Sequence, residues 1–225
     1  MKVNPIKDLE KIELMKQELE KTNNSGVAEK TQFEKKRNRA IFCLGINSAL
    51  RVSDIVTLDL KDVFNEDLSF RDTIGATEQK TKKYKEFPLT NTAKQELASY
   101  ICWYLGIIYK IHIYDISDYH NLLSEDKEKI KEIINTKPLF PSERTGGYMT
   151  RQQVYRILNQ AGEKIGLEKI GTHTMRKTFG YWFYQRTKDI ALLQKILNHS
   201  SQRETMIYIG LEQEEINKAY QNFGL

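Results

Sequence analysis

The sequence of 225 residues predicts a mainly helical fold with one small antiparallel β-sheet, an α+β class. Two observations support this class. Over most of the chain, apolar residues recur at intervals of three and four, which is the spacing of an amphipathic helix. One stretch differs: Asp67–Leu89, DLSFRDTIGATEQKTKKYKEFPL, has short β-prone runs around a lysine-rich turn, which is typical of a hairpin.

Residues 1–30 are expected to form an N-terminal helical extension or linker. They are highly charged with sparse apolar positions, and the run TNNSG interrupts the helical pattern. A stronger pattern begins near Thr31 and leads into SALRVSDIVTL, where Ser53 is expected to cap a short helix. The main domain is therefore expected over residues 31–210.

The hairpin is expected to turn near residues 81–83, and Pro88 is expected to end its second strand. The run TAKQ, Thr92 to Gln95, has the form of a capping box. It predicts a helix whose apolar face consists of Leu97, Ile101, Tyr104, Leu105 and Ile108.

Residues 106–137 mix strand and helix signals and are expected to elaborate the domain. His112 and His120 in this segment have no evident partner residues, so they are expected to be surface or core histidines. The segment 150–165 opens with a second capping box, TRQQ, and keeps helical spacing. Further helices are expected around GTHTMRKTFGYWFYQRT, around DIALLQKILNH and in the tail, residues 211–225.

The composition restricts the class of protein. Lys and Arg number 35 against 30 Asp and Glu, a modest excess that is concentrated in EKKRNR and KTKKYK and hints at a polyanionic partner. Cys43 and Cys102 lie in apolar runs, as expected for reduced thiols of a cytoplasmic protein. No apolar run is long enough for a membrane span, the first residues do not resemble a signal peptide, and neither C-x-x-C nor H-E-x-x-H predicts a metal site.

One group of polar residues is suited to chemistry on an anion. His173 and Arg176 in THTMRKTFG are three apart, so they share one face of a helix, close to its anion-binding start. A bare H-x-x-R is more often a solvated pair. However, His199 and Tyr208 follow in LNHSSQRETMIYIG, and Arg51 stands between two helices, where the alternative is a solvent-facing side chain.

The ordered set of arginine, lysine, H-x-x-R, histidine and tyrosine resembles the catalytic domain of the tyrosine recombinases, the phage-integrase and Cre-like family. The resemblance covers roughly Thr31 to Gly210, in the stretches GINSALRVSDIVTLDLKDV, QKTKKYKEFPL, GTHTMRKTFG and LNHSSQRETMIYIG. It implies the tyrosine recombinase catalytic-domain fold and a catalytic set of Arg51, Lys80, His173, Arg176, His199 and Tyr208.

The chain departs from the family pattern at three points. Asn198 stands where the family motif LGH has glycine. Residues 106–137 are longer than usual, and a separate N-terminal DNA-binding domain of normal size is not evident.

The resemblance implies a site-specific DNA recombinase, an integrase, that cleaves and rejoins DNA through a covalent 3′-phosphotyrosyl intermediate. Tyr208 would attack the phosphodiester. Arg51 and Arg176 would bind the phosphate oxygens with their guanidinium forks. Because guanidinium charge takes the place of Mg²⁺, neither a metal nor another cofactor is expected.

The remaining catalytic roles follow from the same resemblance. Lys80, at the hairpin tip, would donate a proton to the leaving 5′-oxygen, with Lys82, Lys83 and Lys85 as local rivals. His173 would accept the Tyr208 proton or hold a phosphate oxygen, and His199 would hydrogen-bond another oxygen. Local reasoning leaves these proton assignments open.

The expected partner is double-stranded DNA. Basic side chains would contact its phosphates, namely Lys82, Lys83, Lys85, Arg151 and Arg156. For the last two, a solvated outer helix face is an equal alternative. The resemblance implies a tetramer on DNA, with a monomer possible in free solution. In the tail, Ile216, Tyr220 and Phe223 would pack on a neighbouring subunit or on their own domain.

Two other functions fit parts of the pattern. A type IB topoisomerase-like enzyme uses the same chemistry without a partner site, and the tail favours the recombinase over it. A non-catalytic DNA-binding relative would have no need of all six catalytic residues.

Overall fold

The computed structural model describes residues 3–21, 29–77, 84–142, 145–211, 217 and 220–223. Most of the described chain is helical, and two strands form an antiparallel sheet. The predicted fold class is therefore confirmed.

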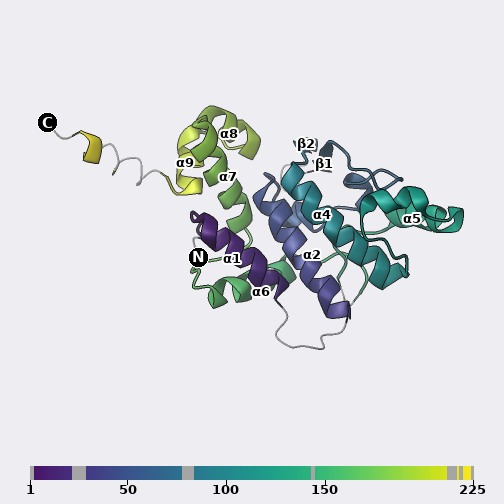
Figure 1. The fold of residues 1–225 in the computed structure, drawn as a ribbon. Coiled ribbons are helices and arrows are strands. Elements are labelled where there is room, and N and C mark those ends of the chain that lie inside the picture. The colour runs from purple at the N-terminus through teal and green to yellow at the C-terminus, as the bar shows by residue number, and fades with distance from the viewer. Residues whose placement is uncertain are drawn as a thin grey trace.

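The helices are distributed along an elongated body (Figure 1). At one end lie α7 (Thr174–Thr187), α8 (Ile190–Leu197) and α9 (Gln202–Ile209), and at the opposite end lies α5 (Ser124–Thr136). This arrangement places the H-x-x-R helix and the tyrosine helix side by side.

The centre of the core is α2 (Glu29–Ile46), which packs against α4 (Asn91–Tyr104) and α7. Phe33 of α2 contacts the rings of Tyr100 and Tyr104 at centroid distances of 5.8 and 5.5 Å. The buried Tyr100 hydroxyl donates a hydrogen bond to the Leu139 carbonyl at 2.8 Å, so its polar end is satisfied inside the core.

The helix α1 (Leu9–Glu20) falls in the segment expected as an extension or linker, yet it belongs to the same core. Asp8 caps it, because its carboxylate accepts the backbone N–H of Glu10 at 2.8 Å. Its inner face packs against α2 and α6 (Arg151–Lys164) and buries Ile12, Met15 and Leu19. The boundary expected at residue 30 does not separate two packing units.

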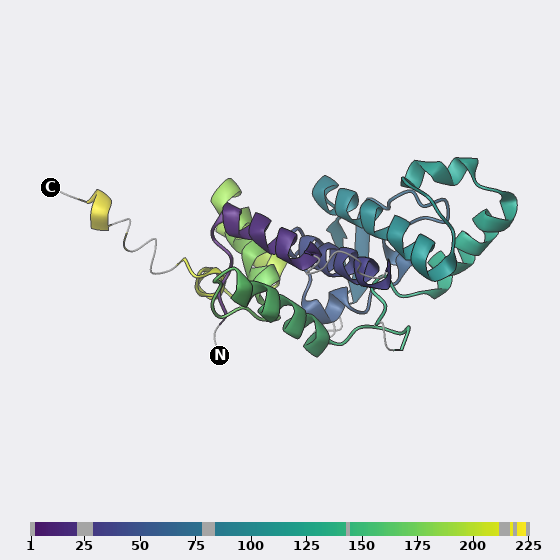
Figure 2. The ribbon, with the colours of Figure 1, turned by 60° about the horizontal axis from the view of Figure 1, so that its bottom comes forward.

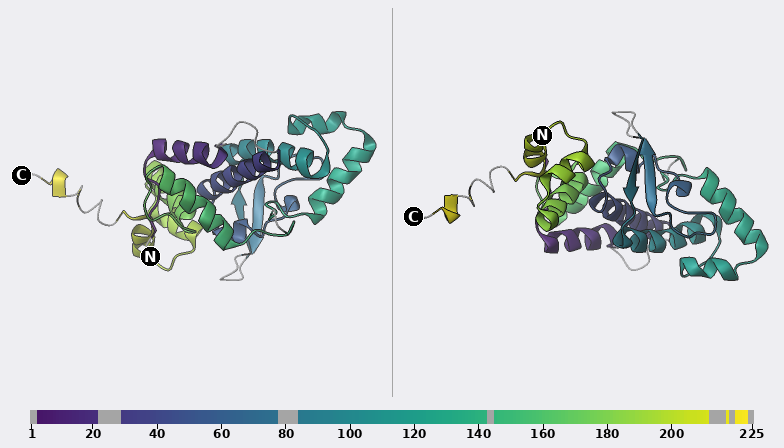
Figure 3. Two further views of the ribbon diagram at one scale, coloured as in Figure 1. Left: turned by 90° about the horizontal axis from the view of Figure 1, so that it is seen from below. Right: turned by 90° about the horizontal axis from the view of Figure 1, so that it is seen from above.

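The predicted hairpin consists of β1 (Thr73–Thr77) and β2 (Tyr84–Pro88). Ile74 pairs with Phe87, and both side chains are buried. Pro88 ends the second strand as predicted, whereas the expected turn at residues 81–83 lies outside the described residues. Figure 3 shows the strands between the α5 end and the end formed by α6–α9.

The cap predicted at Ser53 is wrong. The helix α3 (Val52–Ile55) begins after Arg51, whose backbone N–H donates to the Asp54 carboxylate at 3.3 Å. The Ser53 hydroxyl instead donates to the same carboxylate, also at 3.3 Å. A short 3₁₀ helix, η1 (Leu60–Asp62), follows.

The cap predicted in TAKQ is also wrong by two residues. Thr90 caps α4, since its hydroxyl accepts the Ala93 N–H at 3.3 Å, and Thr92 lies inside the first turn. In contrast, the capping box TRQQ is confirmed at the start of α6, where Thr150 and Gln153 bond reciprocally.

Of the apolar face predicted for α4, Ile108 is misplaced. The helix continues as a π-helical turn, η2 (Leu105–Tyr109), which adds a residue to the turn and so rotates the later side chains. Ile108 is consequently 45% exposed, whereas the other four predicted residues, Leu97, Ile101, Tyr104 and Leu105, are buried.

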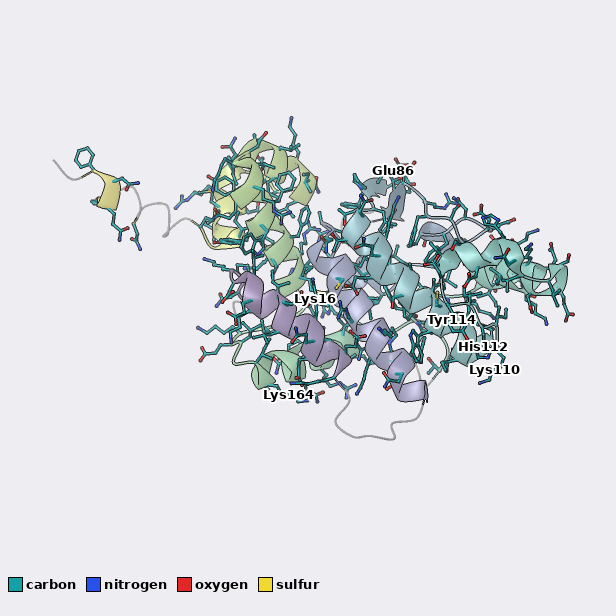
Figure 4. All side chains as sticks on the ribbon, in the orientation of Figure 1. Lys16, Glu86, Lys110, His112, Tyr114 and Lys164 are labelled. Atoms are coloured by element: carbon teal, nitrogen blue, oxygen red, sulfur yellow. The ribbon has the colours of Figure 1, made fainter. Side chains whose placement is uncertain are left out.

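Residues 106–137 form a packed elaboration that includes η3 (Ile116–Asn121) and α5. Ile130, Ile133 and Ile134 of α5 are buried. His112 and His120 are exposed, in line with the surface alternative. Figure 4 labels His112 on this elaboration, on the side of α4 away from α8 and α9.

The described part of the tail, residues 217 and 220–223, projects from the body (Figures 1 and 2). Tyr220 and Phe223 are 80% and 74% exposed, so these two rings do not pack on their own domain. The third residue expected there, Ile216, lies outside the described residues. Among the described helices, none combines the length and hydropathy that crossing a membrane requires.

Candidate active site

His173 lies at the N-terminus of α7, in the N-cap position. The cap is not made by its side chain. Instead, the Thr174 hydroxyl accepts the Gly171 N–H at 3.0 Å, and this bond closes the turn. The turn therefore holds the backbone, and the imidazole points into the site.

Arg176 follows one helical turn later and is almost fully buried, with 2% of its surface exposed. Its guanidinium donates to the backbone carbonyls of Ala49 and Leu197, the latter at 2.7 Å. These carbonyls belong to the loop after α2 and to the end of α8. The fork is thereby fixed in orientation by two elements that are distant in sequence.

Arg51 approaches from the same loop. One of its guanidinium nitrogens, Nη1, is buried. Burial lowers the pKa of His173 and raises that of Tyr208; the positive charge of Arg51 adds to the first shift and opposes the second, so Arg51 acts on the same site. Arg51 is therefore not the solvent-facing residue of the alternative interpretation.

His199 is presented by the end of α8. Asn198 adopts a left-handed conformation there, with φ 54° and ψ 46°. Glycine and asparagine tolerate this region better than other residues, so Asn198 fits the turn that glycine would also fit. The His199 N–H then donates to the Gln194 carbonyl at 3.1 Å, and its ring nitrogen Nδ1 lies 3.1 Å from the Thr205 hydroxyl.

Tyr208 lies near the end of the short helix α9. Ser201 caps this helix, since its hydroxyl accepts the Glu204 N–H at 3.1 Å. Thr205 and Ile209, four residues apart, form its buried face, and Ile209 packs closely against Gly180 of α7.

Ile207, which precedes Tyr208 in the sequence, does not anchor the segment to the core. It is 37% exposed, whereas Ile209 is fully buried. Each residue of a helix is rotated by about 100° from the one before, so Ile207 and Ile209, two residues apart, point about 200° apart and lie on opposite faces. The anchor next to Tyr208 is therefore Ile209 alone.

Four side chains converge on Tyr208. Its hydroxyl lies 3.2 Å from Nδ1 of His173 and takes part in a side-chain hydrogen bond with Arg176. The His199 ring meets the tyrosine ring edge-on at a centroid distance of 4.8 Å. The Lys177 ammonium lies 4.9 Å from the centroid of the same ring.

The pKa shifts of Tyr208 and His173 suit the transfer of a proton from the phenol to the imidazole. Burial raises the pKa of Tyr208, and the charges of Arg176 and Arg51 oppose that rise. Partial burial and the positive charges of Arg176 and Lys177 lower the pKa of His173. At neutral pH the phenol is therefore protonated and the imidazole is neutral, as required for a proton to pass from Tyr208 to His173.

The structure thus brings together five of the predicted catalytic residues, Arg51, His173, Arg176, His199 and Tyr208. Lys80 lies outside the described residues, as do Lys82 and Lys83. The backbone of Lys85 pairs with Ala76 in the hairpin, and its side chain lies outside the described set.

Arg151 and Arg156 occupy different faces of α6. They are exposed and five residues apart, which corresponds to a rotation of about 140° around the helix. The pKa of His173 is lowered first by burial and by the charges of Arg176, Lys177 and Arg51, and the charge of Arg151 adds to this shift.

Two neighbours of the site were missed by the sequence interpretation, Lys177 and Thr205. Lys177 is four residues after His173, so helical spacing placed it on the same face and was a usable signal. Thr205 is buried and supports the His199 ring. Its role had no signal in the sequence, because threonine is also an ordinary helix residue.

Comparisons with known proteins agree with this geometry. The sequence profile of the Phage integrase family matches residues 13–215. The chain is 42% identical over 222 residues to "Probable integrase/recombinase YoeC" of Bacillus subtilis (strain 168), covering 99% of this chain and 97% of that protein. It is 30% identical over 190 residues to the tyrosine recombinase XerC of Thermodesulfovibrio yellowstonii, covering 84% of this chain and 55% of XerC.

Solved structures show the same fold. A crystal structure of the XerH site-specific recombinase matches with a TM-score of 0.63 at 18% identity, covering 98% of this chain and 53% of that one. The chain thus spans about half the length of XerC and XerH, and nearly all of YoeC. It belongs to the phage integrase family, whose matched members are integrases and tyrosine recombinases by name.

Proposed function

We propose that this chain is a site-specific DNA recombinase that cleaves and rejoins DNA through a covalent 3′-phosphotyrosyl intermediate. The observation that carries the proposal is the Tyr208 hydroxyl, 3.2 Å from a neutral His173 and hydrogen-bonded to Arg176. A protonated phenol between a base and a guanidinium is arranged for attack on phosphorus. The family membership supports the same reaction.

The chemical step replaces the phosphodiester bond of DNA by a phosphotyrosyl bond, so the bond energy is conserved. The Tyr208 oxygen forms a bond to phosphorus and gives its proton to His173, while the bond from phosphorus to the 5′-oxygen breaks. The leaving 5′-oxygen takes up a proton and becomes a hydroxyl. Rejoining reverses these events, because a DNA 5′-hydroxyl attacks phosphorus and releases Tyr208. No nucleotide triphosphate is consumed.

The arginines would stabilise the charge that develops on the non-bridging oxygens. Arg176 is preorganised by its two carbonyl partners, and Arg51 adds a second cation. Preorganised donors of this kind are typically worth ~3–4 kcal/mol each in the transition state. The His199 ring beside Tyr208 would hydrogen-bond another phosphate oxygen.

Lys80 is proposed as the acid that protonates the leaving 5′-oxygen. Support comes from its place in the motif QKTKKYKEFPL, between the described strands β1 and β2. Five other cations are proposed to contact the DNA backbone, namely Lys82, Lys83, Lys85, Arg151 and Arg156. Arg151 has the strongest support of the five, since its charge acts on His173.

The proposed partners are double-stranded DNA and further copies of this chain. The XerH structure is a post-cleavage complex bound to a palindromic difH substrate, and a solved structure of the lambda integrase is bound to DNA. A tetramer on DNA is proposed, with the tail contacting a neighbouring subunit through the exposed Tyr220 and Phe223. The matched relatives are bacterial, and a cytoplasmic location is proposed because bacterial DNA lies there.

The test uses chromosomal DNA of the source organism as the probe. Purified protein is incubated with sheared chromosomal DNA from its source organism, denatured, and assayed for covalently attached DNA, which is then sequenced. The proposal predicts an adduct at a defined sequence and no adduct with Tyr208→Phe. An unreactive wild-type protein, or an adduct that persists in Tyr208→Phe, would contradict it. The recovered sequence supplies a nicked suicide duplex, which traps the cleaved state for rate measurements.

A further inference from the structure

The N-terminal strap, residues 3–8, lies outside the family profile, which begins at residue 13. It precedes α1 and packs against α7. Ile6 in the strap is 2% exposed, so the segment is packed into the protein.

Two hydrogen bonds fix the strap on α7. The Ile6 N–H donates to the Thr178 hydroxyl at 2.9 Å, and the Trp182 indole N–H donates to the Ile6 carbonyl at 3.0 Å. Thr178 in turn donates to the Thr174 carbonyl at 2.8 Å, in the first turn of the helix. The strap is therefore tied to the helix that carries His173 and Arg176.

The next residue, Lys7, connects the strap to the tyrosine helix. Its ammonium donates to the Gly210 carbonyl at 2.9 Å and lies 5.2 Å from the ring centroid of Tyr181 on α7. Gly210 ends α9 in a left-handed conformation, φ 73°, two residues after Tyr208. A cation is stabilised at this end of a helix by the partial negative charge of its carbonyls.

We infer that Lys7 is a positioning residue for the nucleophile and that the N-terminal strap is part of the machinery that places it. Lys7 links the end of α9 to α7, so it sets the distance between Tyr208 and the His173–Arg176 pair. The buried face of α9 is held by Ile209 against Gly180 of α7. The inference rests on the proposed function, because it assigns Lys7 a part in the same reaction.

The chain contains a matched control for this bond. Lys11 donates to the Ile165 carbonyl at 2.6 Å, at the end of α6. It is also a lysine from the N-terminal region that binds the carbonyl end of a helix, but that helix does not carry Tyr208. Loss of either lysine removes a bond from an ammonium to the carbonyl end of a helix, and of these two lysines Lys7 is the one bonded to the end of α9.

The first test measures single-turnover cleavage of the suicide duplex, at saturating duplex. Lys7→Met is expected to slow cleavage about tenfold, with unchanged duplex affinity, because a charge-assisted hydrogen bond is lost. Lys11→Met is expected to cleave at the wild-type rate, and Lys7→Arg to recover most of the loss. Equal rates for Lys7→Met and Lys11→Met, or a loss confined to affinity, would overturn the inference while leaving the proposed function intact.

The second test does not depend on cleavage. Hydrogen exchange is followed at residues 206–211, where the N–H groups of Gly210 and Leu211 bond to carbonyls in α9. Lys7→Met is expected to exchange faster there than Lys11→Met or the wild type. Unchanged protection would overturn the inference even if the wild-type protein proved unreactive toward DNA.

Discussion

The Tyr208 hydroxyl and the Nδ1 atom of His173 lie 3.2 Å apart, across the junction between α9 and the start of α7. The contact joins a phenol whose pKa is raised by burial to an imidazole whose pKa is lowered by partial burial and by neighbouring cations. Both shifts favour the neutral pair at physiological pH. The hydroxyl proton can therefore move to the imidazole as the oxygen attacks phosphorus.

The pH dependence of cleavage follows from this pair. His173 accepts a proton only when neutral, so the rate is expected to hold through neutral pH and to fall on the acid side. Because the pKa of His173 is lowered, the fall is expected below its ordinary value of 6.5. The measurement is single-turnover cleavage against pH. A fall centred above 6.5 would contradict the assignment.

Substitution of Arg151 is expected to shift the pH dependence of cleavage. The charge of Arg151 lowers the pKa of His173, so Arg151→Gln is expected to move the acid fall to higher pH. Arg156→Gln is the matched control, since Arg156 lies on another face of α6. The same displacement in both variants would show that general charge, and not Arg151, acts on His173.

Substitutions of Arg176 and of Arg51 are both expected to slow cleavage, but to differ in their cost to the free energy of unfolding. Arg176→Gln is expected to slow cleavage by ~10²–10³-fold, because a preorganised donor is lost. It also leaves the buried carbonyls of Ala49 and Leu197 without the guanidinium, at a cost of about 2–3 kcal/mol in the free energy of unfolding. Arg51→Gln is expected to lose comparable activity with less than about 1 kcal/mol of stability. Denaturant unfolding and cleavage rates compare them, and equal destabilisation by both variants would count against this division.

Asn198 provides a conformational prediction. Its φ of 54° favours asparagine or glycine, so Asn198→Gly is expected to change the free energy of unfolding by only about 0.5 kcal/mol. Asn198→Val is expected to cost about 1–2 kcal/mol, because its side chain clashes with the following carbonyl. Cleavage is expected to follow the same order, since this turn presents His199. Equal losses in both variants would point to the amide side chain instead of the backbone.

Thr205 is expected to hold the His199 ring in place. Its hydroxyl donates to the Ser201 carbonyl at 3.2 Å and lies 3.1 Å from Nδ1 of His199, so the hydroxyl oxygen is placed to accept a proton from that nitrogen and to orient the ring. Thr205→Val keeps the shape and removes the hydroxyl, so cleavage is expected to slow about tenfold. Thr205→Ser keeps the hydroxyl and is expected to retain most of the rate. Equal rates for Val and Ser would remove Thr205 from the account.

The sequence predicted which side chains lie together better than it predicted the local helix caps. His173 and Arg176 were placed correctly because helical spacing fixes side chains three apart on one face. The cap predicted at Thr92 was wrong, because Thr90 can also cap and the start of the helix depends on where strand β2 ends. The π-helical turn at residues 105–109 also had no periodic signal.

Contacts between distant segments had no signal in a single sequence. Arg176 is 127 residues from Ala49, and Lys7 is 203 residues from Gly210. Each bond joins a side chain to a backbone carbonyl, and a carbonyl is present at every position. Residue type therefore does not identify the partner, which emerges only when the helices pack.

The central claim is that Tyr208 becomes covalently joined to DNA, and peptide mapping of the adduct tests it most directly. Wild-type protein is trapped on the suicide duplex, the DNA is trimmed with nuclease, and the modified peptide is identified by mass spectrometry. The account predicts a nucleotide joined through its 3′-phosphate to Tyr208 in the peptide ETMIYIG. A nucleotide on another residue, or one joined through its 5′-phosphate, would contradict it.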